Sequence, residues 1–355
     1  MKNYRIKDIA AMAGVSAGTV DRVLHNRGRV SEDALKKVGD AIKKLDYQPN
    51  LIARSLASKK ACRIITLMPS FKSGEYWSEV SKGIDKIERE FSDYHLQIGR
   101  KFFNQYDKDS FDALVKEIKS EEYQGVIIAT LFKDSTFLLT KWLDEKEIPY
   151  VLIDSYIDKT NCIAYYGTDS YKSGYIGGRL LYGSINSDDN IVLFNIISRG
   201  CVESTQVSTR EKGFRDYLLQ SGYKGDIHLI SLSTEEPEHN KRILDRFFKR
   251  ASDGNRPARA GIIFNSRVHV PAQYFQENEI KDFFLIGYDA IEANTDFLKK
   301  GTVSHLIAQR PEVQGYNSVK ALFYYLALNQ KAEKVNYMPI DILIRENIDY
   351  YNNYI

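Results

Sequence analysis

The side chains that could do chemistry stand close after short apolar runs of the chain. Ser70, Tyr76 and Trp77 follow the run IITLM, Asp154 closes the run YVLID, and Tyr166 lies a little further on. Ligands of open α/β sheets bind at the carboxyl ends of the strands. Hydroxyl, carboxylate and aromatic groups at such positions can hold a small polar molecule by hydrogen bonds and ring contacts. The pattern therefore predicts a ligand-binding cleft.

Motifs of catalysis and of metal binding do not occur in the sequence. The chain contains no GxxxxGK[ST], GxGxxG or HExxH, and its six histidines are scattered without the spacing of metal ligands. We therefore expect no enzymatic activity, no cofactor and no metal site.

The elements that must position these side chains are strands alternating with amphipathic stretches. Six runs are nearly continuous in apolar residues, as is typical of parallel strands covered on both faces. They are IITLM (64–68), GVIIA (125–129), YVLID (150–154), IVLFNII (191–197), AGIIF (260–264) and FFLIG (283–287). About 290 residues of this alternation are too many for one sheet. We therefore predict an α/β core of two doubly wound halves that face a cleft.

The cysteines and the apolar stretches predict the compartment. Cys62, Cys162 and Cys201 are three in number and far apart, which fits a reducing cytoplasm better than a disulfide framework. The first residues are too charged for a secretory signal, and no run approaches the ~18 apolar residues that a membrane span needs. The expected location is cytoplasmic, with no membrane contact.

Charge is distributed unevenly along the chain. Residues 1–60 hold 13 Lys and Arg against 6 Asp and Glu, a balance of +7. Since the whole chain carries +3, the remainder carries −4. A basic front module on a mildly acidic body indicates a polyanionic partner for the front.

The front module has the pattern of short helices joined by a tight turn. Apolar residues recur at helical spacing before Gly14, and Ser16 can cap a second helix over Ala17–Leu24 that buries Val20. Ser31 can open a third helix, whose predicted core face is Leu35, Val38, Ile42 and Leu45. This is a helix-turn-helix, whose second helix fits the DNA major groove. The pattern alone also allows a simple helical hairpin.

A segment that could form only a short helix follows, and with it the front resembles a known family. YQPNLIARSLASKK offers about nine helical residues after Pro49 and Asn50, too few to be stable alone. The string IKDIAAMAGVS..TVDRVLHNRGRVSEDALKKV...LDYQPNLIARSLAS is similar, from residue 5 to 58, to the N-terminal domain of LacI/GalR bacterial transcription repressors. The resemblance implies a helix-turn-helix domain at 1–48 and a hinge helix or linker at 49–60.

The resemblance also implies which residues contact double-stranded DNA. Arg22 could read a guanine, Ala17 offers a methyl contact, and Leu56 matches the wedge that this family inserts into the minor groove. The full expected set is Ser16, Ala17, Gly18, Thr19, Asp21, Arg22, Arg27, Arg29, Ser31, Ala53, Arg54 and Leu56. Asp21 stands where the family more often has Ser, and His25 where it more often has Asn.

The rest of the chain resembles the sugar-binding core that this family shares with periplasmic binding proteins. Its best matches are IPYVLID, GTDSYKSGYIGGRLL, STREKGF, LIGYDAIEAN and AQRPEVQGYNSVKAL. The resemblance implies an N-subdomain at 61–160 with a return at about 290–325, and a C-subdomain at 161–289 with about 326–355. Together with the strand-end positions, it predicts the ligand-binding set Ser70, Tyr76, Trp77, Asp154, Tyr166, Arg210, Asn265, Arg267 and Asp289.

One departure bears on the ligand. Arg267 stands where the family more often has Asp, and two arginines in one cleft would favour a carboxylate or phosphate ligand. A surface salt bridge for Arg267 is an equal alternative.

These observations predict a transcription regulator with a sugar or sugar-acid effector. The resemblance implies that it is a homodimer and a repressor of a near-palindromic operator. Two alternatives share parts of the pattern. A transport binding protein has the same core but would lack the basic front module, and an effector-independent DNA-binding protein would leave Arg210 and Asp289 without a purpose.

Overall fold

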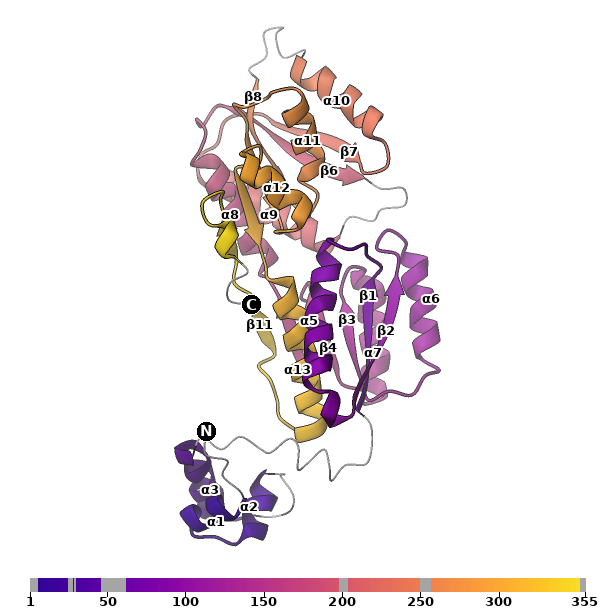
Figure 1. Ribbon diagram of the computed structural model, residues 1–355, viewed down its shortest axis with the longest axis vertical. Coiled ribbons are helices and arrows are strands. Elements are labelled where there is room, and N and C mark those ends of the chain that lie inside the picture. Colours follow the sequence, from indigo (N-terminus) through magenta and orange to yellow (C-terminus); the bar gives the residue numbers. More distant parts are fainter. Residues whose placement is uncertain are drawn as a thin grey trace.

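The computed structural model describes residues 6–24, 28, 30–45, 62–197, 204–249 and 257–351. Its first part is the predicted helix-turn-helix, with α1 over Ile6–Ala13, α2 over Ala17–Leu24 and α3 over Glu32–Leu45 (Figure 1). Gly14 takes φ +64° in the turn, and the Ser16 hydroxyl accepts a 3.1 Å hydrogen bond from the Thr19 amide. The predicted second and third helices are confirmed. The expected hinge lies outside the described residues.

The core of this small bundle differs in one helix from the prediction. Ile9, Val20 and Val38 are fully buried, but Leu35 is 44% exposed. Ala34 and Ala41 take the interior face of α3, because they lie one turn before and about one turn after Val38, whereas Leu35 is rotated by ~100° from that face. The assignment of Leu35 to the core was therefore wrong.

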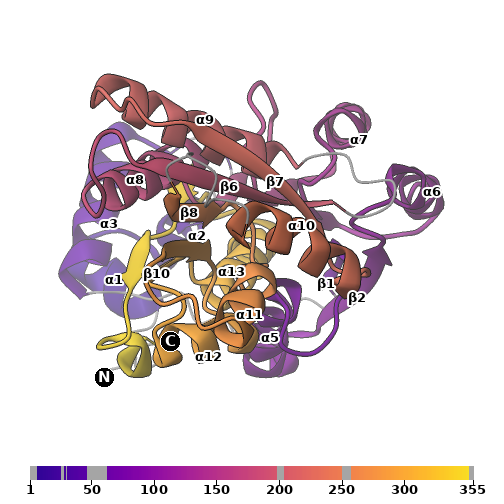
Figure 2. The same cartoon turned by 90° about the horizontal axis from the view of Figure 1, so that it is seen from above.

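The N-lobe is built on a parallel sheet with strand order β11-β5-β4-β3-β1-β2. Helices α5 and α13 pack together on one face, and α6 and α7 cover the other (Figures 1 and 2). The strands are β1 Cys62–Pro69, β2 Leu96–Phe103, β3 Gly125–Ala129, β4 Tyr150–Asp154, β5 Ala164–Gly167 and β11 Val335–Tyr337. The helices are α5 Tyr76–Glu90, α6 Lys108–Ile118, α7 Lys133–Glu145 and α13 Pro311–Leu328, with a 3₁₀ turn, η1, at Ser92–Tyr94.

The C-lobe repeats this plan with strand order β12-β10-β9-β8-β6-β7, in which β12 alone runs antiparallel to its neighbour. Its strands are β6 Asn190–Ile197, β7 Ile227–Ser233, β8 Ala258–Ile263, β9 Phe284–Tyr288, β10 His305–Ala308 and β12 Asp341–Leu343. Helices α8 Ser170–Tyr182 and α9 Thr205–Gln220 pack against each other on one face (Figure 2). The other face carries α10 Pro237–Lys249, α11 His269–Glu277 and α12 Glu292–Lys300, and the 3₁₀ turn η2 spans Ile348–Tyr350.

The chain crosses between the lobes three times, and the crossings correct the predicted boundaries. Strand β5 pairs with β4 and so belongs to the N-lobe, although 161–289 was expected to be C-subdomain. Strand β10 pairs with β9 in the C-lobe, although 290–325 was expected to return to the N-subdomain. The return is α13 with β11, since β11 pairs with β5. Short strands such as β5 and β10 are easily missed in a sequence, and the boundaries shifted with them.

All six predicted strands are present, as β1, β3, β4, β6, β8 and β9. Among the described residues, no helix has the length and apolar character needed to cross a membrane, and no cluster of side chains could hold a metal ion.

Candidate ligand-binding cleft and DNA-binding surface

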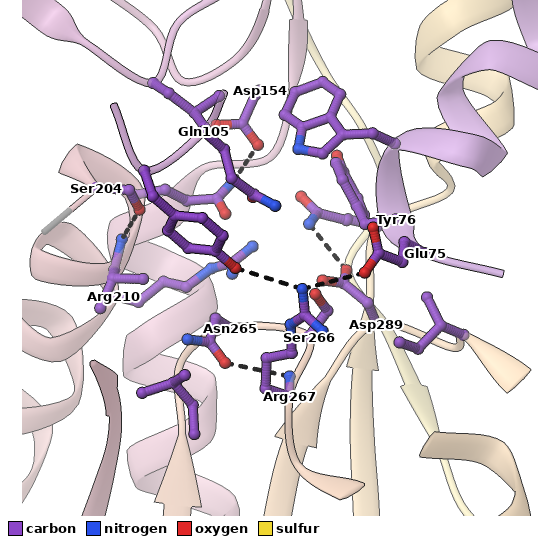
Figure 3. A pocket seen from close by; sticks show the side chains of 18 of the residues that line it. Glu75, Tyr76, Gln105, Asp154, Ser204, Arg210, Asn265, Ser266, Arg267 and Asp289 are labelled. Carbon is purple, nitrogen blue, oxygen red and sulfur yellow. Dashed lines mark hydrogen bonds and ion pairs between the residues drawn. The ribbon is translucent and has the colours of Figure 1, made fainter. Parts of the chain in front are cut away.

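A cavity of about 150 Å³ lies between the lobes, where the carboxyl ends of both parallel sheets face each other (Figure 3). Loops after β1, β2, β3 and β4 supply the N-lobe wall, and α9 with the ends of β6, β8, β9 and β10 supplies the other. Seven of the nine predicted residues line it: Tyr76, Trp77, Asp154, Arg210, Asn265, Arg267 and Asp289.

Ser70 and Tyr166 do not line the cavity, and their assignment is corrected. Ser70 is exposed, and its amide extends the sheet by a 2.8 Å hydrogen bond to the Phe103 carbonyl. Tyr166 alternates with Tyr165 along β5, and successive side chains of a strand point to opposite faces. Its ring therefore lines a separate hollow beside Lys320 on α13.

Two buried carboxylates form the floor of the cavity. Asp154 and Asp289 end their strands with φ of +80° and +66°, and are 5% and 4% exposed. Asp154 accepts hydrogen bonds from Gln206 at 2.9 Å and from the Ser155 hydroxyl at 3.2 Å, while Asp289 accepts one from Gln309 at 2.9 Å.

Burial dominates the electrostatics of both carboxylates. It raises the pKa of Asp154 to about 6, with the charge of Asp289 adding to the rise and that of Arg210 opposing it. Burial also raises the pKa of Asp289, again opposed by Arg210. Both groups are therefore poised to accept hydrogen bonds from a ligand that restores some of the lost solvation.

Arg210 is the cation whose charge acts on both carboxylates, and it is only 1% exposed. Its Nη1 donates to the Phe264 carbonyl at 2.8 Å, and its guanidinium lies 4.1 Å from the centre of the Tyr288 ring. Its Nε and Nη2 are buried with no hydrogen-bond partner among the described residues. Since a buried unpaired donor is costly, these two N–H groups are suited to a ligand that completes them.

Arg267 is 23% exposed and so lies toward the mouth of the cavity, and it forms the salt bridge that was one of its two alternatives. It lines the cavity, and its Nη2 forms a 3.2 Å ion pair with Glu75 of the N-lobe. The same nitrogen lies 3.4 Å from the Tyr106 hydroxyl (Figure 3).

Sequence reasoning missed several residues of the cleft. Gln105 and Tyr106 follow β2, and Gln309 follows β10, two strands that were not among the predicted runs. Gln206 lies one turn before Arg210 on α9, so that helical spacing to the predicted arginine could have indicated it. Glu75 was not predicted, although its neighbours Tyr76 and Trp77 were.

The described part of the DNA-binding set lies around α2. Ala17, Gly18 and Arg22 are exposed, as a reading surface requires. Ser16 shares a 2.9 Å hydrogen bond with the Thr19 hydroxyl, and the Ser31 hydroxyl accepts one of 3.3 Å from the Ala34 amide at the start of α3. Asp21 is half-buried. Arg27, Arg29, Ala53, Arg54 and Leu56 lie outside the described residues.

Comparison with known proteins decides the family. The profile described as bacterial regulatory proteins, lacI family, matches residues 5–50, and a periplasmic binding protein domain matches residues 64–331. The chain belongs to the LacI family. It is a DNA-binding transcription regulator with a periplasmic-binding-protein-like core, and not an enzyme.

Individual relatives agree with this assignment. The ribose operon repressor of Lactococcus lactis subsp. lactis (strain IL1403) is 27% identical over 354 residues, which cover 97% of each chain. The regulator RegA of Clostridium saccharobutylicum is 33% identical over 177 residues. These residues make up 50% of this chain and 51% of RegA, so the match spans about half the length of that relative.

Solved structures share the core. A candidate LacI transcriptional regulator from Bacteroides fragilis has a TM-score of 0.77 at 38% identity, over 82% of this chain and all of that chain. GanP, a glucose-galactose binding protein from Geobacillus stearothermophilus, has a TM-score of 0.67 at 19% identity, over 81% of this chain and 99% of its own. This second likeness shows the shared fold.

Proposed function

We propose that this LacI-family regulator acts in the cytoplasm as a homodimeric repressor whose operator binding is controlled by a neutral sugar in the cleft. Each subunit places α2 in the major groove of one half-site of a near-palindromic operator, and the hinges meet at its centre. The observation that carries the ligand site is Arg210, a fully buried cation with two unpartnered N–H groups beside two carboxylates.

The geometry supports binding of vicinal hydroxyls. Arg210 can donate to hydroxyl oxygens through Nε and Nη2, while Asp154 and Asp289 accept from hydroxyl hydrogens. Tyr76 and Trp77, whose rings meet edge to face at 5.1 Å between centroids, add apolar surface on the N-lobe wall. A ring with hydroxyls at its edge and apolar C–H groups on its faces uses all of these features.

Charge favours a neutral sugar over a sugar acid. Three carboxylates, those of Glu75, Asp154 and Asp289, line the cavity with two guanidiniums, those of Arg210 and Arg267. Because Glu75 already neutralises Arg267, a further negative charge on the ligand would enter a site with no unpaired cation at its mouth. The relative named ribose operon repressor is consistent with a neutral pentose or hexose.

A ligand that bridges the lobes can also change DNA binding. Asp154 ends a strand of the N-lobe, and Arg210 and Asp289 belong to the C-lobe, so one molecule that binds all three restricts the angle between the lobes. Any difference in sugar affinity between two lobe arrangements shifts their populations. A coupling of ~1–3 kcal/mol is sufficient for regulation.

Thermal unfolding in the presence of candidate ligands tests this proposal. A ligand at a hundred times its Kd adds ~2.7 kcal/mol of stability. We expect stabilisation by at least one neutral pentose or hexose, and its loss in Arg210→Ala and Asp289→Ala. Ser70→Ala, which changes a residue outside the cavity, is the matched control and should keep the full shift. Stabilisation by sugar acids alone, or a shift that both variants retain, would overturn the proposal.

A further inference from the structure

The two lobes are joined at the mouth of the cleft by side chains that come from three separate loops. Glu75 lies between β1 and α5, Tyr106 follows β2, and Arg267 lies between β8 and α11. A single C-lobe nitrogen, Nη2 of Arg267, is 3.2 Å from the Glu75 carboxylate and 3.4 Å from the Tyr106 hydroxyl. Figure 3 shows both contacts as dashed lines that meet at the guanidinium of Arg267.

Both partners of the ion pair are held in place by their own loops. The second oxygen of Glu75 accepts a 2.9 Å hydrogen bond from the Lys72 amide, and the Arg267 amide donates to the Asn265 side chain at 3.1 Å. The two side chains are 26% and 23% exposed. A pair that is fixed in geometry and largely out of water is worth more than a mobile surface pair.

An ion pair of similar burial lies within one lobe. Arg100 pairs with Glu88 at 2.6 Å, with exposed fractions of 25% and 33%, but both belong to the N-lobe. Unlike the Arg100–Glu88 pair, the Glu75–Arg267 pair links the two lobes.

We propose that Glu75 and Arg267 form an ionic clasp that closes the cleft before a ligand arrives and decides the charge of the ligand it accepts. The clasp rests on the proposed function in one respect, that the cleft is the effector site. A neutral polyol can be bound beside Arg210 with the clasp formed. A ligand carboxylate or phosphate must replace Glu75 as the partner of Arg267, and so must break the clasp. Glu75 is thus a specificity-determining residue.

Charge reversal in the full-length protein without ligand tests the closure. In Glu75→Arg two cations face each other, and in Arg267→Glu two carboxylates do, so both variants should open. The expected readouts are a larger radius of gyration in small-angle scattering and faster hydrogen exchange in the loops at 70–77 and 265–268. The double variant E75R/R267E restores an opposite-charge pair and should return to the wild-type values.

A matched pair inside the N-lobe controls for effects of charge alone. Glu88→Arg and Arg100→Glu break an ion pair of similar burial, and should leave the radius of gyration and the exchange of both loops unchanged. If Glu75→Arg does not fold, Glu75→Gln removes the charge with little change of shape, and should show the same opening to a smaller extent. Single variants that stay as closed as the wild type, or a double variant that stays open, would overturn the clasp.

Inorganic phosphate tests the charge selection. Phosphate should not raise the melting temperature of the wild type above that in chloride of equal ionic strength, but should raise that of Glu75→Gln by several degrees. Adding Arg267→Gln to that variant should abolish the gain. Equal stabilisation of wild type and Glu75→Gln, or a gain that survives the loss of Arg267, would contradict the proposal. Neither test contains a sugar, so failure of the clasp is distinguishable from failure of the sugar site.

Discussion

The carboxylate of Asp154 should reduce the stability of the ligand-free protein, and its replacement by Asn should therefore stabilise it. Asn keeps the shape of the side chain, tolerates the positive φ of this position and can still accept the hydrogen bond from Gln206. It lacks the negative charge that burial penalises.

The pKa supplies the magnitude and the pH dependence. Burial raises the pKa of Asp154 from 3.8 to about 6, so the ionised form is disfavoured in the folded state by roughly 3 kcal/mol. Since the folded protein binds the proton more tightly than the unfolded chain, wild-type stability falls as pH rises from about 4 to about 6, and the penalty is complete above that. Asp154→Asn avoids the penalty. Its advantage should be near zero at pH 4 and reach roughly 3 kcal/mol at pH 8.

Tryptophan fluorescence during unfolding is a suitable assay, because both tryptophans of the chain, Trp77 and Trp142, lie in the same lobe as Asp154. At pH 8 the expected gain corresponds to a rise in melting temperature of roughly 6 to 12 °C. The same variant should bind the effector more weakly, since the carboxylate is lost. A variant less stable than the wild type at pH 8, or an advantage equal at pH 4 and pH 8, would refute the reasoning.

Three further perturbations test other parts of the molecule. Arg210→Met removes two donors that the ligand should complete, so effector affinity measured by calorimetry should fall by at least ~100-fold (about 3 kcal/mol), and an unchanged Kd would rule out this contact. Gly174→Ala would place a methyl group 1.8 Å from the carbonyl oxygen of Arg210, so it should lower both the melting temperature and effector affinity. Gly39→Ala should instead stabilise the first domain by up to ~1 kcal/mol, because its methyl group would meet no described atom within 4 Å beyond its chain neighbours and the nearby backbone of its own helix. Calorimetric melts that show the same sign for both would contradict the packing. Leu56→Ala should lose most operator-specific binding in a gel-shift titration and keep the salt-dependent non-specific part, and an unchanged operator affinity would show that the wedge assignment is wrong.

The parts of the fold that the sequence predicts are those specified locally. The cap at Ser16 and the turn at Gly14 define α2 within a few residues. The central strands can be predicted because strands buried on both faces have continuous apolar residues. Strand β2 does not have such a continuous apolar run. Its sequence LQIGRKFF alternates in burial at the edge of the sheet, so its carboxyl end, with Gln105 and Tyr106, could not be placed.

In the cleft, too, the residues that could be predicted are those with a local signal in the sequence. Asp154 could be predicted because it directly ends an apolar run, and Arg210 and Asp289 because their surroundings resemble a family. The pairing of Glu75 with Arg267 joins residues 192 positions apart. No local pattern reports such a contact, since it depends on how two lobes face each other across three crossings.

Operator binding with and without the effector tests the central claim most directly. The operator is obtained by selecting the full-length protein against random double-stranded DNA, and the sugar by the thermal screen. We predict that saturating sugar changes the operator Kd by about 5- to 150-fold, which corresponds to ~1–3 kcal/mol of coupling. The same sugar should leave the operator Kd of Arg210→Met unchanged. An operator Kd that the sugar does not alter in the wild type would contradict the account of this protein as a ligand-controlled regulator.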